Sequence, residues 1–243
     1  MRKTDNSLSI AIPVYNEEKR LENGLDILID ALRASSFDDY EIIVCDNGST
    51  DSTMKIAEEY AERYSGRMFC CHTYKKGVGR ALKIGWVKSS YNLLCSIDVD
   101  MSADPCQIAR GVSLMRENKC DIVNGSRNLH HSKVTGRNLL RKTLTAIFNL
   151  ILRIVFASGI TDGMSGFQII RRSKFKEVLD KHELSDQWFF SAELFLRMEA
   201  LGMNTCEMPV RWIEDDESKV RVIQLSLQYI SEIIRLRRQI QKR

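Results

Sequence analysis

The stretch YNLLCSIDVD, residues 91–100, decides the fold class. Tyr91 to Ile97 is a short apolar run with the length of a buried strand, and Asp98 and Asp100 follow it directly. Residues i and i+2 of an extended chain project to the same side, and neighbouring carboxylates repel unless a cation or proton joins them. The segment therefore predicts a strand end that binds Mg²⁺ or Mn²⁺. A solvated turn with an aspartate cap is the alternative.

Similar apolar runs alternate with helical patterns around this stretch. Strands are expected over residues 8–14, 40–46, 68–73, 91–97 and 121–124, and helices over 17–34, 51–64, 79–89 and from 104 onward. This alternation predicts an α/β fold with a parallel, doubly wound sheet. Such sheets bind ligands beyond the carboxyl ends of their strands.

Four polar clusters fall at these strand ends, at residues 15–17, 46–49, 98–100 and 125–127. Their convergence on one edge of the sheet would form a pocket. Taken alone, each cluster has a structural alternative. The second has the composition of an ordinary strand-to-helix turn. The glycine-rich basic loop at 75–80 could approach phosphates through backbone N–H groups, or could be a flexible connection.

The second half of the chain has a different pattern, with helices expected over 137–156, 191–201 and 220–243 and strands over 166–171 and 205–213. A polar stripe recurs every four residues along the first of these helices: Arg141, Thr145, Asn149 and Arg153. The helix is too apolar for full solvation and too interrupted to cross a bilayer, and five of the last nine residues are basic. Peripheral membrane contact is therefore predicted; packing of both helices into the core or a dimer interface is the alternative.

Composition sets broad limits. The chain has 243 residues, 44% of them hydrophobic and 28% charged, as expected for one large α/β domain. Its net charge of +4 gives no support for a nucleic-acid partner. Its seven cysteines include no CxxC pair, which predicts buried thiols in a reducing compartment and no disulfide framework. Residues 1–7 are polar and too short for a signal peptide, which favours a cytoplasmic location.

In order along the chain, these motifs resemble glycosyltransferase family 2 enzymes with the GT-A fold, specifically the polyprenyl- and dolichyl-phosphate glucose and mannose synthases. The resemblance covers roughly residues 8–237, and its late segments look most like the dolichyl-phosphate glucosyltransferases. The motifs are residues 13–17, 46–51, 77–79, 98–100, 125–127, 162–167, 188–194, 210–212 and 218–219. The resemblance to this family implies one domain over 1–243, with a nucleotide-sugar-binding half (8–127), an acceptor half (128–217) and a basic amphipathic C-terminal helix (218–243).

The resemblance also implies a role for each matching position. The donor, UDP-glucose or GDP-mannose, would be held by Pro13, Val14, Tyr15, Glu17, Val44, Asp46, Gly79, Arg80, Asp98, Val99 and Asp100. Asp98 and Asp100 would bind Mg²⁺ or Mn²⁺, with Asp100 as the principal ligand. The phosphate of a polyprenyl acceptor would be held by Arg127, Arg137, Arg141 and Lys219. The catalytic set would be Asp98, Asp100, Arg127 and Lys219.

Three positions depart from the family pattern. Asn47 replaces a usual second aspartate, Val78 replaces a lysine that Arg80 is close enough to substitute, and Ser102 replaces a metal-binding glutamine of some members. The implied reaction is an inverting transfer of a hexose to a lipid phosphate by an enzyme peripheral on the inner face of a membrane.

Two alternative functions remain at this point. A family 2 transferase acting on a polysaccharide or glycan hydroxyl would need a base carboxylate, for which Glu193 or Asp186 could serve. A catalytically inactive nucleotide-sugar-binding subunit has its support in Asn47 and Val78.

Overall fold

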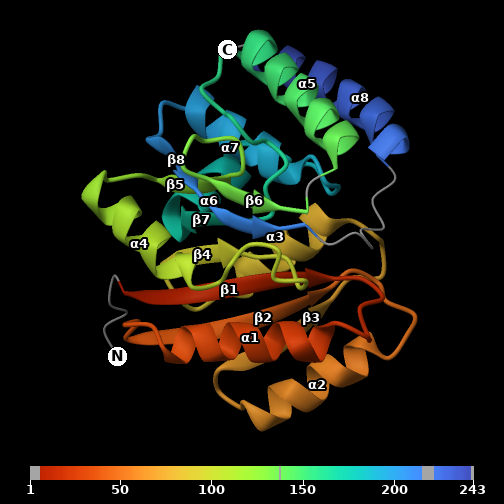
Figure 1. Cartoon of the computed structure of the whole chain (residues 1–243), viewed down its shortest axis with the longest axis vertical. Helices are drawn as coiled ribbons and strands as arrows, with labels where there is room; N and C mark the ends of the chain where they lie inside the picture. Colours follow the sequence, from red (N-terminus) through yellow and green to blue (C-terminus); the bar gives the residue numbers. More distant parts are fainter. Residues whose placement is uncertain (1–5, 137, 215–221, 242–243) are drawn as a thin grey trace.

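A computed structural model describes residues 6–136, 138–214 and 222–241, with helices on both faces of a central sheet (Figure 1). The sheet strands are Ser7–Val14 (β1), Asp39–Asp46 (β2), Met68–His72 (β3), Leu93–Ser96 (β4), Ile122–Ser126 (β5), Gln168–Arg171 (β7) and Thr205–Pro209 (β8). The helices are Leu21–Arg33 (α1), Thr53–Arg63 (α2), Val78–Lys88 (α3), Gln107–Glu117 (α4), Leu139–Phe156 (α5), Arg172–Lys181 (α6), Phe190–Ala200 (α7) and Val222–Gln241 (α8).

The strand order is β3-β2-β1-β4-β7-β5-β8, and every pairing is parallel except those of β7. The predicted α/β class with a mostly parallel, doubly wound sheet is therefore confirmed. Alternate residues of each strand point to opposite faces of the sheet and pack into two separate hydrophobic cores. Ile10 and Ile42 pack under α1, α2 and α4, whereas Ala11 and Ile43 pack under α3, α6 and α7.

Some elements differ from their predicted form. The helix expected from Glu17 begins at Leu21, because Asn16 has a φ of 52° and a turn follows it. The strand expected over 205–213 divides after Pro209, which has no N–H to continue the ladder. Its second part, Arg211–Ile213 (β9), pairs with Lys133–Thr135 (β6) in a separate two-stranded sheet. Neither β6 nor α6 was predicted.

The cysteine prediction was wrong at one pair. Cys120, before β5, and Cys206, in β8, form a disulfide across 86 residues of sequence. The parallel pairing of β5 with β8 brings them together, and no local spacing could indicate it. Cys45, Cys71 and Cys95 are buried free thiols, as expected, whereas Cys70 is partly exposed and Cys106 is exposed, contrary to the prediction.

Helix α5 has an unusual orientation of its side chains. Thr145 and Asn149 of the predicted polar stripe are buried, whereas Arg153 is exposed. The apolar residues turned to solvent on α5 are Leu139, Leu140, Ile147, Leu150, Ile151 and Ile154. Helix α8 lies beside α5 (Figure 1), with the Phe148 and Tyr229 rings 5.0 Å apart. No helix in the described ranges is long and apolar enough to cross a membrane.

Candidate active site

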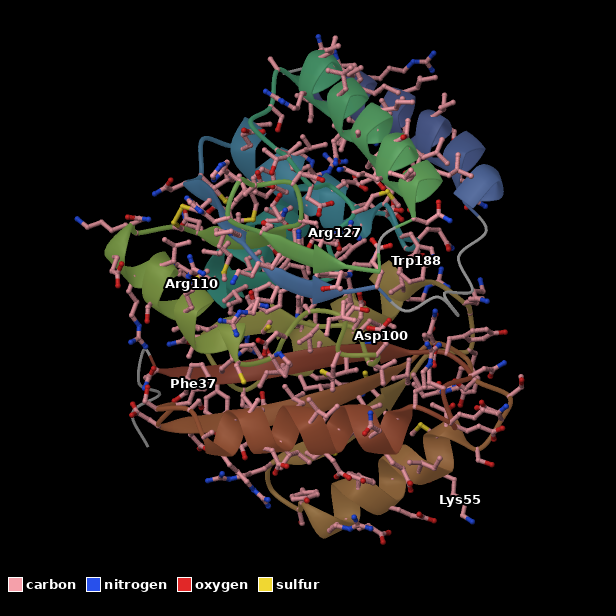
Figure 2. The ribbon with its side chains drawn as sticks, in the orientation of Figure 1. Phe37, Lys55, Asp100, Arg110, Arg127 and Trp188 are labelled. Atoms are coloured by element: carbon pink, nitrogen blue, oxygen red, sulfur yellow. A yellow bond between two sulfur atoms is a disulfide. The ribbon has the colours of Figure 1, made fainter. Side chains whose placement is uncertain are left out.

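The carboxyl ends of β1, β2 and β4 lie side by side at one edge of the sheet. Pro13, which has no N–H to donate, lies beyond the end of the pairing on one side: β1 pairs with β4 only as far as Ala11, but with β2 as far as Val14. Asp98 and Asp100 follow β4 at this edge. Arg127 follows β5, and its charge acts on Asp98; Figure 2 labels Asp100 and Arg127.

Asp98 is half-buried because the chain packs closely against it. A Cβ atom added to Gly166 would lie 2.1 Å from Asp98 Oδ2, so a larger residue there would displace the Asp98 carboxylate. Ser96 Oγ donates to the Gly166 carbonyl at 2.9 Å and fixes this approach. Asp100 is exposed, and its Oδ1 accepts from the Ser102 backbone N–H at 2.9 Å. The fold therefore holds one inner and one outer carboxylate at the same strand end.

The charges at this strand end are unbalanced. Burial, and then the negative charge of Asp100, raise the pKa of Asp98 to about 7, while Arg127 acts in the opposite direction. A cation between the two carboxylates would relieve this repulsion. In the described part of the chain, no cluster of three or more His, Cys, Asp or Glu residues could hold a metal. Two aspartates nevertheless fit Mg²⁺ or Mn²⁺, because such ions complete their coordination with water and substrate phosphates.

Arg127 is held in place by the loop after α5. Its Nε donates to Asp162 Oδ2 at 2.8 Å and its Nη2 to Oδ1 at 2.9 Å, while its guanidinium lies 4.8 Å from the centre of the Trp212 ring. Burial alone would raise the pKa of Asp162, but the charge and hydrogen bonds of Arg127 outweigh it and leave that pKa lowered. Glu207 fixes the loop in turn by accepting from the Thr161 and Asp162 backbone N–H groups. The predicted phosphate contact of Arg127 would have to use the part of its guanidinium turned away from Asp162.

At the end of β2, Asp46 lies beneath a residue that the sequence did not single out. None of its side chain is exposed, and His72 Nδ1 lies 2.5 Å from its Oδ2. The signal was present, because β3 ends at His72 and pairs in register with β2 at Asp46. Nearby, the Lys76 ammonium lies 3.5 Å from the centre of the Tyr15 ring.

The glycine-rich loop packs against the connection between α6 and α7. Cβ atoms on Gly77 and Gly79 would lie 2.5 Å from the carbonyl oxygens of Asp186 and Ser185, respectively. Arg80, which is close enough to substitute for the loop lysine usual in the family, pairs with Asp186 and donates to the Lys75 carbonyl at 2.9 Å. Asn47 accepts from the Gly77 N–H at 2.5 Å, so this departure from the family pattern supports the loop.

The two carboxylates considered as general bases are occupied. Glu193 is fully buried and accepts from Arg197 Nη2 at 2.7 Å and Arg235 Nη2 at 2.6 Å. Asp186 pairs with Lys83 at 2.7 Å as well as with Arg80. Neither is a free base in this arrangement.

Three predicted acceptor contacts fall outside what the structure describes. Arg137 and Lys219 lie outside the described residues, and the Arg141 side chain is not described. Their roles stay predictions, as does the contact of Glu17, whose carboxylate lies 2.9 Å from Arg20 Nε.

Comparison with known proteins places this site in a family. The model of "Glycosyl transferase family 2" matches residues 9–179. A dolichyl-phosphate beta-glucosyltransferase of Trichomonas vaginalis is 31% identical over 224 residues, covering 88% of this chain and 68% of that protein. A protein of the same description from Dictyostelium discoideum is 30% identical over 241 residues, covering 95% and 73%.

Solved structures share the fold at low sequence identity. Glucosyl-3-phosphoglycerate synthase of Mycobacterium tuberculosis, in complex with Mn²⁺, UDP-glucose and phosphoglyceric acid, superposes with a TM-score of 0.72 at 18% identity, covering 95% of this chain and 79% of that one. A Pyrobaculum calidifontis mannosyltransferase in complex with GDP-mannose and Mn²⁺ gives 0.63 at 16% identity, covering 94% and 64%. With its family-model match and the sheet edge just described, the chain belongs to glycosyl transferase family 2.

Proposed function

We propose that this chain transfers glucose, with inversion, from UDP-glucose to a dolichyl-type phosphate at a membrane surface. The observation that carries the proposal is the Asp98–Asp100 pair, two mutually repelling carboxylates at the strand end where a doubly wound sheet binds its ligand. Relatives named dolichyl-phosphate beta-glucosyltransferases support this choice of sugar and acceptor.

The occupied carboxylates favour a phosphate acceptor over a hydroxyl acceptor. A sugar hydroxyl needs a base to take its proton, and Glu193 and Asp186 are both engaged in ion pairs. A lipid monophosphate is already an anion at neutral pH, so its oxygen can attack the sugar without such a base. The site therefore has to orient the two reacting groups and stabilise charge.

The residues of the chain divide these tasks. Mg²⁺ or Mn²⁺ bound at Asp98 and Asp100 would supply Lewis-acid stabilisation of the departing nucleoside diphosphate. Arg127, fixed by Asp162 and Trp212, holds its guanidinium charge close enough to Asp98 to oppose the rise in the Asp98 pKa. A fixed guanidinium needs little reorganisation as phosphate charge develops, which favours the transition state.

The exposed face of α5 supports contact with a membrane. Ile147, Leu150 and Ile154 are 50%, 54% and 72% exposed and lie within about two turns of one another. Ile230 and Ile234 of the adjacent helix α8 are also exposed, at 51% and 47%. A contiguous exposed apolar surface of this kind marks a binding surface more often than a solvated one. A bilayer surface would cover it and place the lipid acceptor beside the site.

A substrate screen tests the proposed reaction. The purified chain is incubated with Mn²⁺, UDP-glucose or GDP-mannose, and either a short dolichyl phosphate or a free oligosaccharide, and products are identified by mass. Glucosyl-phosphoryl-dolichol should form and glucosylated oligosaccharide should not. Transfer only to the oligosaccharide would contradict the proposed acceptor, and absence of any transfer would favour the inactive-subunit alternative.

Flotation with anionic vesicles tests the membrane surface. Replacing Ile147, Leu150 and Ile154 by serine should remove most vesicle binding while the chain stays folded, because these side chains are exposed. The matched control replaces Ile27 and Val87, exposed apolar residues on α1 and α3, by serine and should leave binding unchanged. Equal loss in both variants would contradict a specific role of α5.

A further inference from the structure

His72 has one ring nitrogen committed to the protein and one available to a ligand. Its Nδ1 lies 2.5 Å from Asp46 Oδ2. A carboxylate only accepts hydrogen bonds, so Nδ1 of the neutral ring carries the proton and donates it. Nε2 is then left with an unprotonated lone pair, and no described residue forms a hydrogen bond with it. In this neutral tautomer, in which Nδ1 donates to Asp46, Nε2 of His72 is a hydrogen-bond acceptor.

A ligand that approaches the ends of β2 and β3 meets His72 before Asp46. The exposed fraction of the side chain is 30% for His72 and 0% for Asp46. The Asp46 carboxylate also accepts from the Ser49 N–H, at 3.2 Å to Oδ1 and 3.3 Å to Oδ2. With its oxygens engaged and its surface covered, Asp46 is not accessible to a base. Tyr74, 95% exposed, lies edge-on to the His72 ring at 4.6 Å.

We propose that His72 recognises the base of the donor nucleotide by accepting a hydrogen bond at Nε2 from a ring N–H, and so determines base specificity. The inference rests on the proposed use of a nucleoside-diphosphate sugar. Uracil presents a single edge donor, N3–H, between two carbonyl oxygens, and one acceptor nitrogen matches it. Guanine presents two adjacent donors, N1–H and N2–H, which an accessible carboxylate would match, but the Asp46 carboxylate is covered. The geometry therefore favours uracil over guanine.

Titration calorimetry with Mn²⁺ tests this role on the wild-type chain and a His72→Ala variant. The probes are UDP, UDP methylated at N3, GDP and inorganic pyrophosphate, which has no base. The wild type should bind UDP about tenfold more tightly than N3-methyl-UDP, the scale of one hydrogen bond. His72→Ala should weaken UDP binding about tenfold, should no longer distinguish the two uridine ligands, and should bind pyrophosphate as the wild type does.

A matched control separates the acceptor from general effects at this surface. Tyr74→Ala removes the ring next to His72 and should keep the wild-type preference for UDP over N3-methyl-UDP. Unchanged or tighter UDP binding by His72→Ala would overturn the role of His72, as would equal weakening of UDP and pyrophosphate. Tighter binding of GDP than of UDP by the wild type would overturn the uracil assignment and the proposed donor together. Tight UDP binding by the wild type with an unaffected His72→Ala variant would overturn the role of His72 alone.

Discussion

Two sets of acidic residues in this molecule have opposite environments. Asp98 and Asp100 stand two residues apart, and no salt bridge reaches them from any residue that the structure describes. Asp162 and Glu193 are fully buried, and each accepts hydrogen bonds from an arginine at 2.9 Å or less. A carboxylate that is paired with an arginine therefore stabilises the fold. A carboxylate that has no such partner remains available to a cation and, through it, to a phosphate.

The largest effect should come from removing an unneutralised carboxylate. Asp100→Ala should lower turnover more than a thousandfold, because stabilisation of the departing diphosphate is worth several kcal/mol. The melting temperature should stay the same or rise, since one of two repelling charges is gone. Turnover and thermal unfolding are measured together, with Asp30→Ala on the solvent side of α1 as the active control. Near-normal turnover in Asp100→Ala would rule out the proposed mechanism.

Removing a neutralised carboxylate should instead destabilise the fold. Glu193→Ala leaves the Arg197 guanidinium, 1% exposed, without its buried partner, and such a loss costs about 3–5 kcal/mol. Urea denaturation measures the change in the free energy of unfolding. Glu177→Ala is the control, because its ion pairs with Lys174 and Lys181 lie at the surface, where solvent screens them and their loss should change stability little. An equal loss of unfolding free energy in Glu193→Ala and Glu177→Ala would contradict the proposed difference between buried, neutralised carboxylates and exposed ones.

Gly166→Ala tests whether the position of Asp98 matters as well as its charge. The added methyl would lie 2.1 Å from Asp98 Oδ2, so the carboxylate has to move. A displacement of this order should lower turnover about a hundredfold. Gly159→Ala, whose new Cβ has 3.7 Å of clearance, is the control for a glycine change in the same connection. A fully active Gly166→Ala enzyme would show that Asp98 tolerates displacement.

Local sequence patterns predict the unneutralised carboxylates and the i,i+4 pair of Glu193 with Arg197, but not the ion pairs between distant residues. Asp98 and Asp100 follow an apolar run directly, so their place at a strand end needs no knowledge of distant residues. The pairing of Arg127 with Asp162 joins residues 35 apart, and that of Glu193 with Arg235 joins residues 42 apart. Periodicity cannot predict which distant cation reaches a carboxylate; for Glu193, the spacing to Arg197 on α7 was the local signal that it is not a free base.

The same limit explains His72 and α5. The end of β3 was predicted to within a residue, but that His72 covers Asp46 depends on the register between β2 and β3. The polar stripe of α5 was predicted from its spacing. That Thr145 and Asn149 face inward follows only from packing, in which Asn149 Oδ1 accepts from the Gly163 N–H at 3.0 Å. Local sequence patterns therefore predict where strands and helices lie. Whether a polar side chain on them points to the core or to solvent depends on tertiary contacts.

The smallest effect concerns Asp162, where the substitution keeps an acceptor. Asp162→Asn should lower the free energy of unfolding at pH 7 by about 1.5–2 kcal/mol, the scale of a hydrogen bond to a charged group. Because the pKa of Asp162 is lowered in the folded state, its stabilisation is complete above the unfolded pKa of about 3.9 and is lost as the pH falls through the folded value. The wild type and variant should therefore differ by a constant amount from pH 7 to about 5 and converge below about 4. Urea denaturation across this range measures the difference, and a gap that persisted unchanged at the lowest pH would show that the Arg127 pair contributes nothing through charge.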